Sequence, residues 1–167
     1  MEEEYFPVVD ESGTVIGRES RQVCHAKTFI LHPVVHLHVF NGRGELYLQK
    51  RSETKDIQPG KWDTAVGGHV RYGETIEDAL VREAGEELSI KDFEAKKLMS
   101  YVFRSQVERE VVNVFTTIYE GAITPDHDEV SDGRFWRLSE IEDYLGKGVF
   151  TPNFEGEFRK LKAALGM

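Results

Sequence analysis

Three glutamates stand close together near the middle of the chain, at Glu83, Glu86 and Glu87. On a helix, at about 100° per residue, they fall within an arc of about 100° that borders the apolar stripe. Carboxylates at these spacings repel one another by roughly 0.2–0.5 kcal/mol per pair, so something must offset the repulsion. Hard oxygen ligands that converge on one point suit Mg²⁺ or Mn²⁺. By itself the triplet fits either such a metal site or a solvated acidic face with Arg82 as counter-ion.

The residues around the triplet form a longer pattern that favours the metal site. Gly68, Glu74, Arg82 and the three glutamates stand in the register Gly, five residues, Glu, seven residues, Arg-Glu, aliphatic, any residue, Glu-Glu. The pattern resembles the Nudix signature, which here spans residues 68–90. One position departs from it, because Ser89 replaces a Gly that normally takes a left-handed conformation after the helix. Serine there costs on the order of 1 kcal/mol, which affects the end of the helix and not the chemistry.

The Nudix resemblance implies a reaction in which water attacks a phosphorus of a diphosphate. Mg²⁺ or Mn²⁺ would be held by the three glutamates together with the backbone carbonyl of Gly67 or Gly68. Arg82 would orient the glutamates, and either Glu87 or Glu129 would act as the base.

The N-terminal half of the chain narrows this resemblance. Several segments are similar to the isopentenyl diphosphate isomerase-like branch: Asp-Glu-Ser-Gly-Thr-Val-Ile-Gly at 10–17, His25, Leu31-His32, Pro59-Gly-Lys-Trp62 and Gly68-His69. That isomerase binds a metal through three histidines and two glutamates, which are matched here by His25, His32, His69, Glu108 and Glu110. The match implies a second metal, Zn²⁺ or Mn²⁺, at the histidines. The isomerase grips its diphosphate with basic residues that are matched here by Arg21, Arg51 and Lys55.

Two alternatives to hydrolysis remain. The isomerase needs a cysteine before the Gly-His pair, and Gly67 stands there, so isomerisation is disfavoured. A non-catalytic module that senses a nucleotide is the second alternative, although such modules usually show an eroded signature. A lone histidine is more often structural than a ligand, so the second metal site depends on whether the five residues converge. His36 and His38 match no ligand position, and we expect them to be structural.

The composition favours one domain that acts on a small molecule. The chain has 167 residues, 40% hydrophobic and 31% charged, with a net charge of -9, which argues against nucleic acid or an anionic membrane as partner. We expect one Nudix domain over residues 1–167, an α/β/α sandwich with a mixed β-sheet. Its partner would be a small-molecule diphosphate, with nucleoside diphosphate-linked compounds as the family default, and a homodimer is left open. Because Cys24 is the single cysteine and the N-terminus lacks a signal-peptide pattern, we expect a cytoplasmic protein.

The elements that must position these residues follow from hydrophobic periodicity and capping signals. A hairpin is expected over residues 5–9 and 14–18, and a helical turn at 21–26. Further strands are expected at residues 34–40, 45–51, 62–66, 98–103, 111–119 and 135–138. A helix is expected at 75–88, and two more close the chain. Ser139 with Glu142 would cap the first of these, and the second would begin at Pro152.

Overall fold

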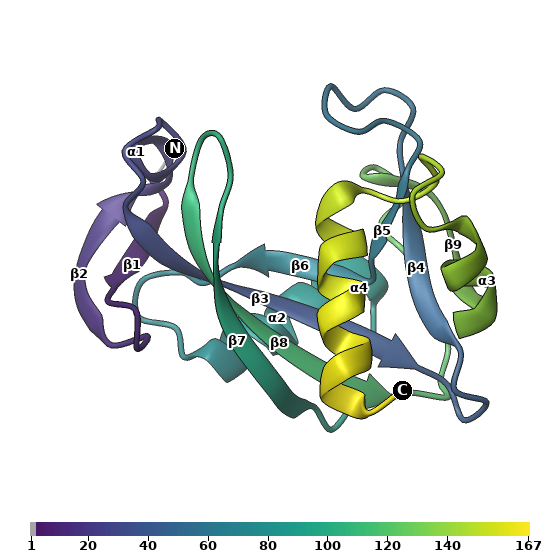
Figure 1. Cartoon of the computed structure of the whole chain (residues 1–167). Helices are drawn as coiled ribbons and strands as arrows, with labels where there is room; N and C mark the ends of the chain where they lie inside the picture. Colours follow the sequence, from purple (N-terminus) through teal and green to yellow (C-terminus); the bar gives the residue numbers. More distant parts are fainter. Residues whose placement is uncertain (1–2) are drawn as a thin grey trace.

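A mixed sheet of seven strands forms the centre of the molecule, whose computed structural model describes residues 3–167 (Figure 1). Its order is β5 (Trp62–Thr64), β4 (Leu46–Arg51), β3 (Leu31–Phe40), β8 (Arg109–Ile118) and β7 (Lys96–Arg104). In addition, β6 (Val66–His69) pairs with β3, and β9 (Val130–Trp136) pairs with β4. β3 and β8 run parallel and the other pairs run antiparallel, as expected for a mixed sheet. Met1 and Glu2 of the predicted domain lie outside the described residues.

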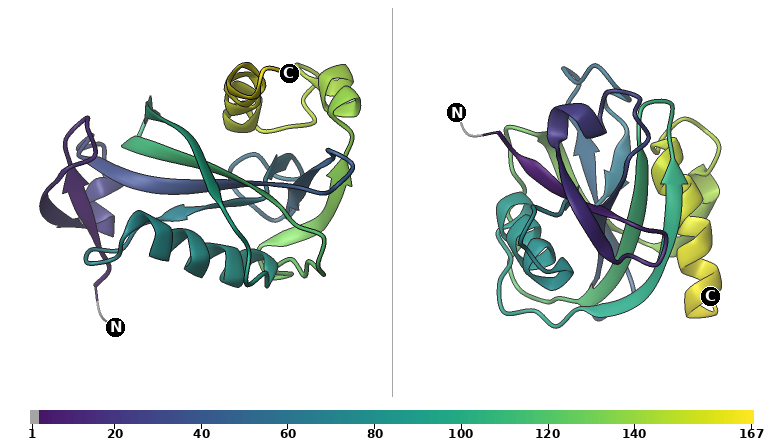
Figure 2. Two further views of the ribbon diagram at one scale, coloured as in Figure 1. Left: turned by 90° about the horizontal axis from the view of Figure 1, so that it is seen from below. Right: turned by 90° about the vertical axis from the view of Figure 1, so that its left-hand side faces the viewer.

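Helices cover both faces of this sheet, as the left view of Figure 2 shows. α2 (Ile76–Leu88) lies on one face, and α3 (Leu138–Tyr144) and α4 (Pro152–Leu165) lie on the other. Alternation along β3 divides the core between the two faces, since successive side chains of a strand point in opposite directions. Val35, Leu37 and Val39 pack with the apolar stripe of α2, whereas Phe40 packs with the core under α4. The predicted α/β/α sandwich is therefore confirmed.

The N-terminal hairpin forms a small sheet of its own at one end of the molecule (Figure 1). Its strands are β1 (Tyr5–Val9) and β2 (Val15–Ser20), so the second arm ends two residues later than predicted. The short α1 (Arg21–Cys24) follows at once, capped by Ser20, whose hydroxyl oxygen accepts from the amide of Val23 at 3.2 Å. β1 packs against β3, and the ring of Phe6 is fully buried. The hairpin therefore closes one end of the central sheet.

The two ends of α2 match their sequence signals. The hydroxyl oxygen of Thr75 accepts a hydrogen bond from the amide of Asp78 at 3.0 Å, as an N-cap residue does. Ser89 follows the helix with a φ of 56°, so the serine adopts the left-handed conformation for which the signature uses glycine. The buried residues between these ends are Ala79, Leu80, Ala84 and Leu88. This burial leaves the three glutamates on the border of the buried face.

The strands predicted at 34–40, 45–51, 98–103 and 111–119 differ from the observed ones by one to three residues at an end, and two other strand predictions were wrong by more. The segment 62–66 is two strands and not one, because Trp62–Thr64 pairs with β4 whereas Val66–His69 pairs with β3. The chain changes partner at Ala65, which no local hydrophobic pattern signals. The strand predicted at 135–138 runs instead over Val130–Trp136, since its pairing with β4 starts in the polar stretch before the aromatic residues.

The predicted cap of α3 was also wrong. The Oε1 atom of Glu140 accepts from the amide of Arg137 at 3.0 Å, so the helix starts at Leu138 and Ser139 lies inside it. The pairing of Ser139 with Glu142 is therefore excluded as the cap. α4 begins at Pro152, as predicted. Within residues 3–167, each helix is too short or too polar to cross a membrane.

Candidate active site

Most of the residues singled out by the sequence line two adjoining cavities, of which the larger is a cleft of about 520 Å³. Its walls come from α1, β3, β4, β5, β6, α2, β8 and the start of α4. An adjoining hollow of about 270 Å³ shares five lining residues with it: Gln49, Arg51, Asp63, Glu87 and Glu129. A larger groove of about 750 Å³, lined by Phe40 and Ile118, lies at the far ends of β3 and β8 and contains none of the predicted site residues. The chemistry therefore belongs to the smaller, polar cleft.

The helix glutamates reach this cleft from α2. Glu87 lines both hollows, and its Oε2 atom accepts from the backbone N–H of Gly67 at 3.0 Å. Glu83 presses against β6, because a β-carbon added at Gly68 would lie 2.2 Å from the Cδ atom of Glu83. The side chain of Glu86 is 55% exposed at the edge of the site. The glycine of the signature is thus needed for Glu83 to approach the strand.

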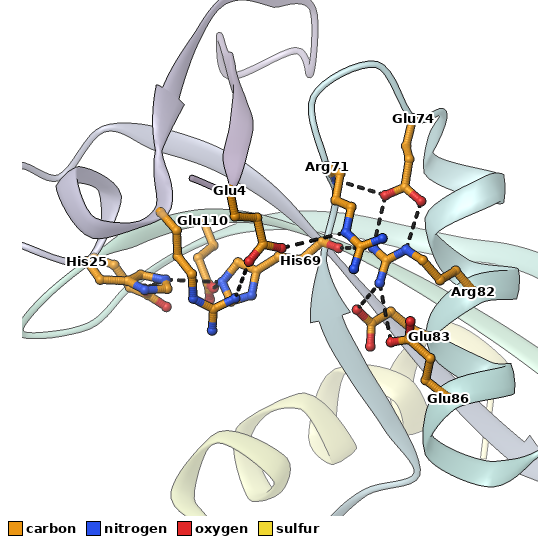
Figure 3. A network of polar contacts seen from close by, with 11 residues as sticks. Glu4, His25, His69, Arg71, Glu74, Arg82, Glu83, Glu86 and Glu110 are labelled. Atoms are coloured by element: carbon orange, nitrogen blue, oxygen red, sulfur yellow. Dashed lines mark hydrogen bonds and ion pairs between the residues drawn. The ribbon is translucent and has the colours of Figure 1, made fainter. Parts of the chain in front are cut away.

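Arg82 holds this acidic group together (Figure 3). Its guanidinium donates to both carboxylate oxygens of Glu74, at 2.8 and 2.9 Å, and to Glu83 Oε1 at 2.8 Å. It also donates to the backbone carbonyl of His69 at 3.0 Å, and Glu74 in turn accepts from the amide of Arg71 at 2.9 Å. These bonds join the helix to the end of β6 and to the loop that follows. The hydrogen bonds from Arg82 hold the pKa of Glu74 below its usual range.

Two of the helix carboxylates have raised pKa values. Burial raises the pKa of Glu87 to about 8, and the charge of Glu83 adds to the effect. Burial also raises the pKa of Glu83, although its hydrogen bond from Arg82 opposes the shift. Charging both groups is therefore unfavourable in the protein alone, and a cation placed between them would relieve the penalty.

A second cluster lies at the end of the cleft nearest the N-terminal hairpin. The ligand atoms of His25, His32, His69 and Glu108 all lie within 4.8 Å of one another. The Nε2 atom of His25 lies 2.7 Å from Glu108 Oε2 and 3.2 Å from His69 Nε2. These residues come from the turn after α1, from β3, from the end of β6 and from the start of β8. Folding thus brings together four of the five residues of the predicted second site.

The protonation of these histidines suits metal ligation. The Nδ1–H of His32 donates to the backbone carbonyl of Ile30 at 2.9 Å, which leaves its Nε2 lone pair facing the cluster. This Nε2 is buried and has no hydrogen-bond partner within residues 3–167. Burial lowers the pKa of His32, and burial together with the neighbouring histidines lowers that of His69 to about 3. The ring of Phe6 stacks on His69 with centroids 4.5 Å apart.

Glu110, the fifth predicted residue, stands slightly outside the cluster. Its Oε2 atom lies 3.7 Å from His69 Nε2 and 4.0 Å from His32 Nε2. Burial, followed by the hydrogen bond with Glu108 and its charge, raises the pKa of Glu110. Figure 3 shows the side chains of Glu110, His25 and His69 together, with the backbone carbonyl of His69 linked to Arg82.

The predicted phosphate-binding residues line the same cavities but hold acidic or carbonyl partners. Arg51 donates from Nε to the carbonyl of Ile57 at 3.1 Å. Arg21 pairs with Glu4 at 3.2 Å. Lys55 pairs with the side chain of Glu129, the alternative base, and both line the smaller hollow. The structure therefore brings the three cations to the rim of the cleft.

Sequence reasoning missed some members of the site. Asp63 lines both hollows and accepts from the hydroxyl of Thr151 at 3.1 Å, and burial raises the pKa of Asp63. The short run that contains it carries no signal, since only the pairing of β5 with β4 brings it to the cleft. His36, expected to be structural, also lines the cleft and lies 2.8 Å from Glu157. Burial works against a charged His36, but the charge and hydrogen bond of Glu157 outweigh it and raise its pKa.

Comparison with known proteins gives concordant results. The family model of the NUDIX domain matches residues 30–154. The chain is 35% identical over 150 residues to an uncharacterized Nudix hydrolase of Nostoc, covering 87% of each chain. It is 32% identical over 160 residues to isopentenyl-diphosphate Delta-isomerase 2 of Photorhabdus laumondii, covering 92% of this chain and 89% of the relative. The crystal structure of DR0079 from Deinococcus radiodurans is similar in fold, with a TM-score of 0.79 and 24% identity over 94% of this chain and 98% of that one.

Proposed function

Because the chain belongs to the Nudix family, in the branch that resembles isopentenyl diphosphate isomerase, we propose that this Nudix-type hydrolase cleaves the diphosphate bond of a small organic molecule with Mg²⁺ or Mn²⁺. The substrate class that we favour is a nucleoside diphosphate-linked compound. One observation carries the proposal: the acidic border of α2 faces a cleft whose rim carries Arg51 and Lys55. Carboxylates suited to a hard cation thus lie opposite cations suited to a phosphate.

The residues of the cleft fit a divalent cation. Within the described chain, the side chains that line the cleft of about 520 Å³ include five carboxylates but only two arginines. A diphosphate would be repelled from such a lining unless positive charge were added. Glu83 and Glu87 are partly buried, have raised pKa values and lie around the glycine pair at 67–68, whose carbonyl oxygens are further hard ligands. We assign Glu83, Glu86, Glu87 and one of these carbonyls to the metal.

The roles of the protein groups follow from their contacts. A bound Mg²⁺ or Mn²⁺ supplies charge neutralisation of the phosphate oxygens and acidifies the attacking water. Arg82 holds the Glu83 carboxylate and the loop in position through its hydrogen bonds. We assign the base to Glu87 in preference to Glu129, because the Glu129 carboxylate is already paired with Lys55. Arg51, at the rim of both hollows, would stabilise charge on the leaving phosphate.

The histidine cluster is proposed as a second metal site. His25, His32 and His69 offer nitrogen ligands, and Glu108 offers oxygen, a set that suits Zn²⁺ or Mn²⁺ better than Mg²⁺. The buried Nε2 of His32, which has no partner among residues 3–167, supports this assignment, since such an atom is costly without a ligand or donor. We keep Glu110 as an outer member of the site.

Isomerisation is the second candidate, favoured by the relative from Photorhabdus laumondii and by the convergence of the histidines. We place it below hydrolysis because Gly67 has no side chain with which to move a proton. A panel of organic diphosphates tested with Mg²⁺ and with Mn²⁺ distinguishes the two. Phosphate-ester products that disappear in Glu83→Gln, but persist in the exposed control Glu77→Gln of the same helix, support hydrolysis. A panel without any hydrolysed compound contradicts it.

A further inference from the structure

A buried carboxylate lies where the cleft meets α4. Only 1% of the side chain of Glu157 is exposed, yet three polar groups approach it. Its Oε1 atom accepts from the Tyr101 hydroxyl at 2.6 Å and lies 2.8 Å from His36 Nδ1, and its Oε2 atom lies 2.6 Å from His38 Nε2. An ionised carboxylate at this depth requires hydrogen-bond donors, so the facing nitrogens of both histidines carry protons.

The two histidines differ in what their other edges meet. His38 is fully buried, and its Nδ1 has no hydrogen-bond partner in the described part of the chain. His36 keeps 24% of its side chain exposed and lines the cleft. A β-carbon added at Gly67 would lie 3.6 Å from His36 Nε2, so this nitrogen faces β6 at the wall of the cleft. Of the two rings anchored on Glu157, His36 alone is among the residues that line the described cleft.

The position of His36 along β3 places it between the two acidic ends of the cleft. Its register partner on β6 is Gly67, whose N–H donates to Glu87 at 3.0 Å. His32 of the histidine cluster lies four residues earlier on the same face of β3, roughly 13 Å away at the rise of a strand. The ring therefore lines the cleft on a strand that connects the histidine cluster with the partner of Glu87, so a diphosphate that reached both ends could meet it.

We propose that His36 is a substrate-binding residue whose Nε2–H donates to a phosphate oxygen of the diphosphate, and that Glu157 is the residue that positions its ring. The inference rests on the proposed function, since it requires a diphosphate in this cleft. Glu157 holds the ring through Nδ1, so the opposite edge, which carries Nε2, is the one left to meet a phosphate oxygen in the cleft.

Two substitutions of His36 separate contact with the diphosphate from structural support of α4. In His36→Asn the amide reaches about as far as Nδ1, so the bond to Glu157 is kept and the nitrogen that faces the cleft is removed. In His36→Gln the amide reaches about as far as Nε2, so a donor to the cleft is kept. His38→Gln is the matched control, because it retains a donor to the same carboxylate from a residue that is buried away from the cleft.

The test is the affinity for methylenediphosphonate, a diphosphate analogue that resists hydrolysis, measured by calorimetry in Mg²⁺ with the full chain. We expect His36→Asn to weaken binding about tenfold or more, the loss expected for a hydrogen bond to a charged group. We expect His38→Gln to stay within about threefold of the wild type, and His36→Gln to lose clearly less than His36→Asn because it keeps a donor to the cleft. Equal binding by the wild type and His36→Asn overturns the inference, as do equal losses in both His36 variants. A wild type that fails to bind refutes the proposed function together with the inference.

The role of Glu157 has its own readout. Glu157→Gln should raise KM for the best substrate of the diphosphate panel several-fold and leave kcat within about threefold, because the ring binds substrate and transition state alike. A fall in kcat at constant KM overturns the positioning role. Melting temperatures of all variants, measured beside the wild type, show that each one is folded under the conditions of the assay.

Discussion

Replacing Glu87 with glutamine should make the metal-free protein more stable and the enzyme much less active. Burial and the charge of Glu83 raise the pKa of Glu87 to about 8 from an ordinary value of 4.5. Between these two pH values the folded state keeps a proton that the unfolded state has released. The free energy of unfolding of the wild type therefore falls as pH rises through this window. Glutamine is uncharged at every pH, so the variant escapes this loss.

The magnitude follows from the pKa difference. A pH of 7 lies about 2.5 units above the pKa of this carboxyl group in the unfolded chain. Ionisation in the unfolded state therefore lowers the free energy of unfolding of the wild type by at most about 3.4 kcal/mol, at 1.36 kcal/mol per unit. Partial exposure of the side chain and a weaker bond to the Gly67 amide in the variant reduce the net gain to about 1–2 kcal/mol. For a chain of this size, that gain raises the melting temperature by about 2–8 °C.

The assay is thermal unfolding at pH 7 in EDTA and in Mg²⁺, together with turnover of the best diphosphate substrate. Glu87→Gln should melt higher than the wild type in EDTA, gain less from Mg²⁺, and lose at least about 100-fold in rate. Glu77→Gln, an exposed change on the same helix, should melt at or slightly below the wild type, because it removes an acidic residue from the first turn. A variant that melts lower in EDTA would refute the pKa argument, and near-normal turnover at saturating Mg²⁺ would remove the helix glutamates as the site.

Three further predictions address the other parts of the cleft. Gly68→Ala should lower turnover at least about tenfold because the new β-carbon displaces the Glu83 carboxylate. An unchanged rate would show that catalysis does not depend on the close approach of Glu83 to the backbone at position 68. Zn²⁺ affinity at the histidines, measured by calorimetry, should fall less than about tenfold between pH 7.5 and 6, because burial lowers the pKa of His32 and His69 and so opposes their protonation. A loss of roughly 50-fold, as for three ordinary histidines near pKa ~6.5, would contradict this. Isopentenyl diphosphate should yield no dimethylallyl isomer by proton NMR, and clear formation of the isomer would show that Gly67 does not prevent the reaction.

Features that depend on local periodicity were predictable from the sequence. α2 was predicted within one residue because Thr75 caps it and its apolar stripe has helical spacing. The mixed sheet and its two covering layers followed from the resemblance to the family, and the comparisons bear out that family. The cap of α3 was missed because two acidic residues, Glu140 and Glu142, stand near its start, and sequence spacing does not show which one folds back.

Features that depend on pairing between distant segments were not predictable from pattern alone. The switch of partner at Ala65 occurs inside the run 62–66, which contains no glycine or proline to mark it. Asp63 enters the site only through that pairing. Glu157 and His36 are 121 residues apart, and although Glu157 lies on the apolar face of α4 with Phe154 and Leu161, its histidine partners cannot be read from the sequence. The family resemblance named the members of the histidine cluster, but their convergence is a property of the folded chain.

The pairing of His36 with Gly67 is one structural reason for the preference for hydrolysis over isomerisation that we propose. The two residues face each other across β3 and β6, and a β-carbon at position 67 would already lie 3.4 Å from the His36 ring. A longer side chain there, such as the cysteine that an isomerase needs, would have to share the centre of the cleft with that ring. The buried carboxylate of Glu157 holds the His36 ring on its far side, so moving the ring would break a buried hydrogen bond. The absence of a thiol at Gly67 and the anchoring of His36 therefore belong together. In the arrangement that we propose, the histidine nitrogen binds phosphate where an isomerase would place a side chain that transfers a proton.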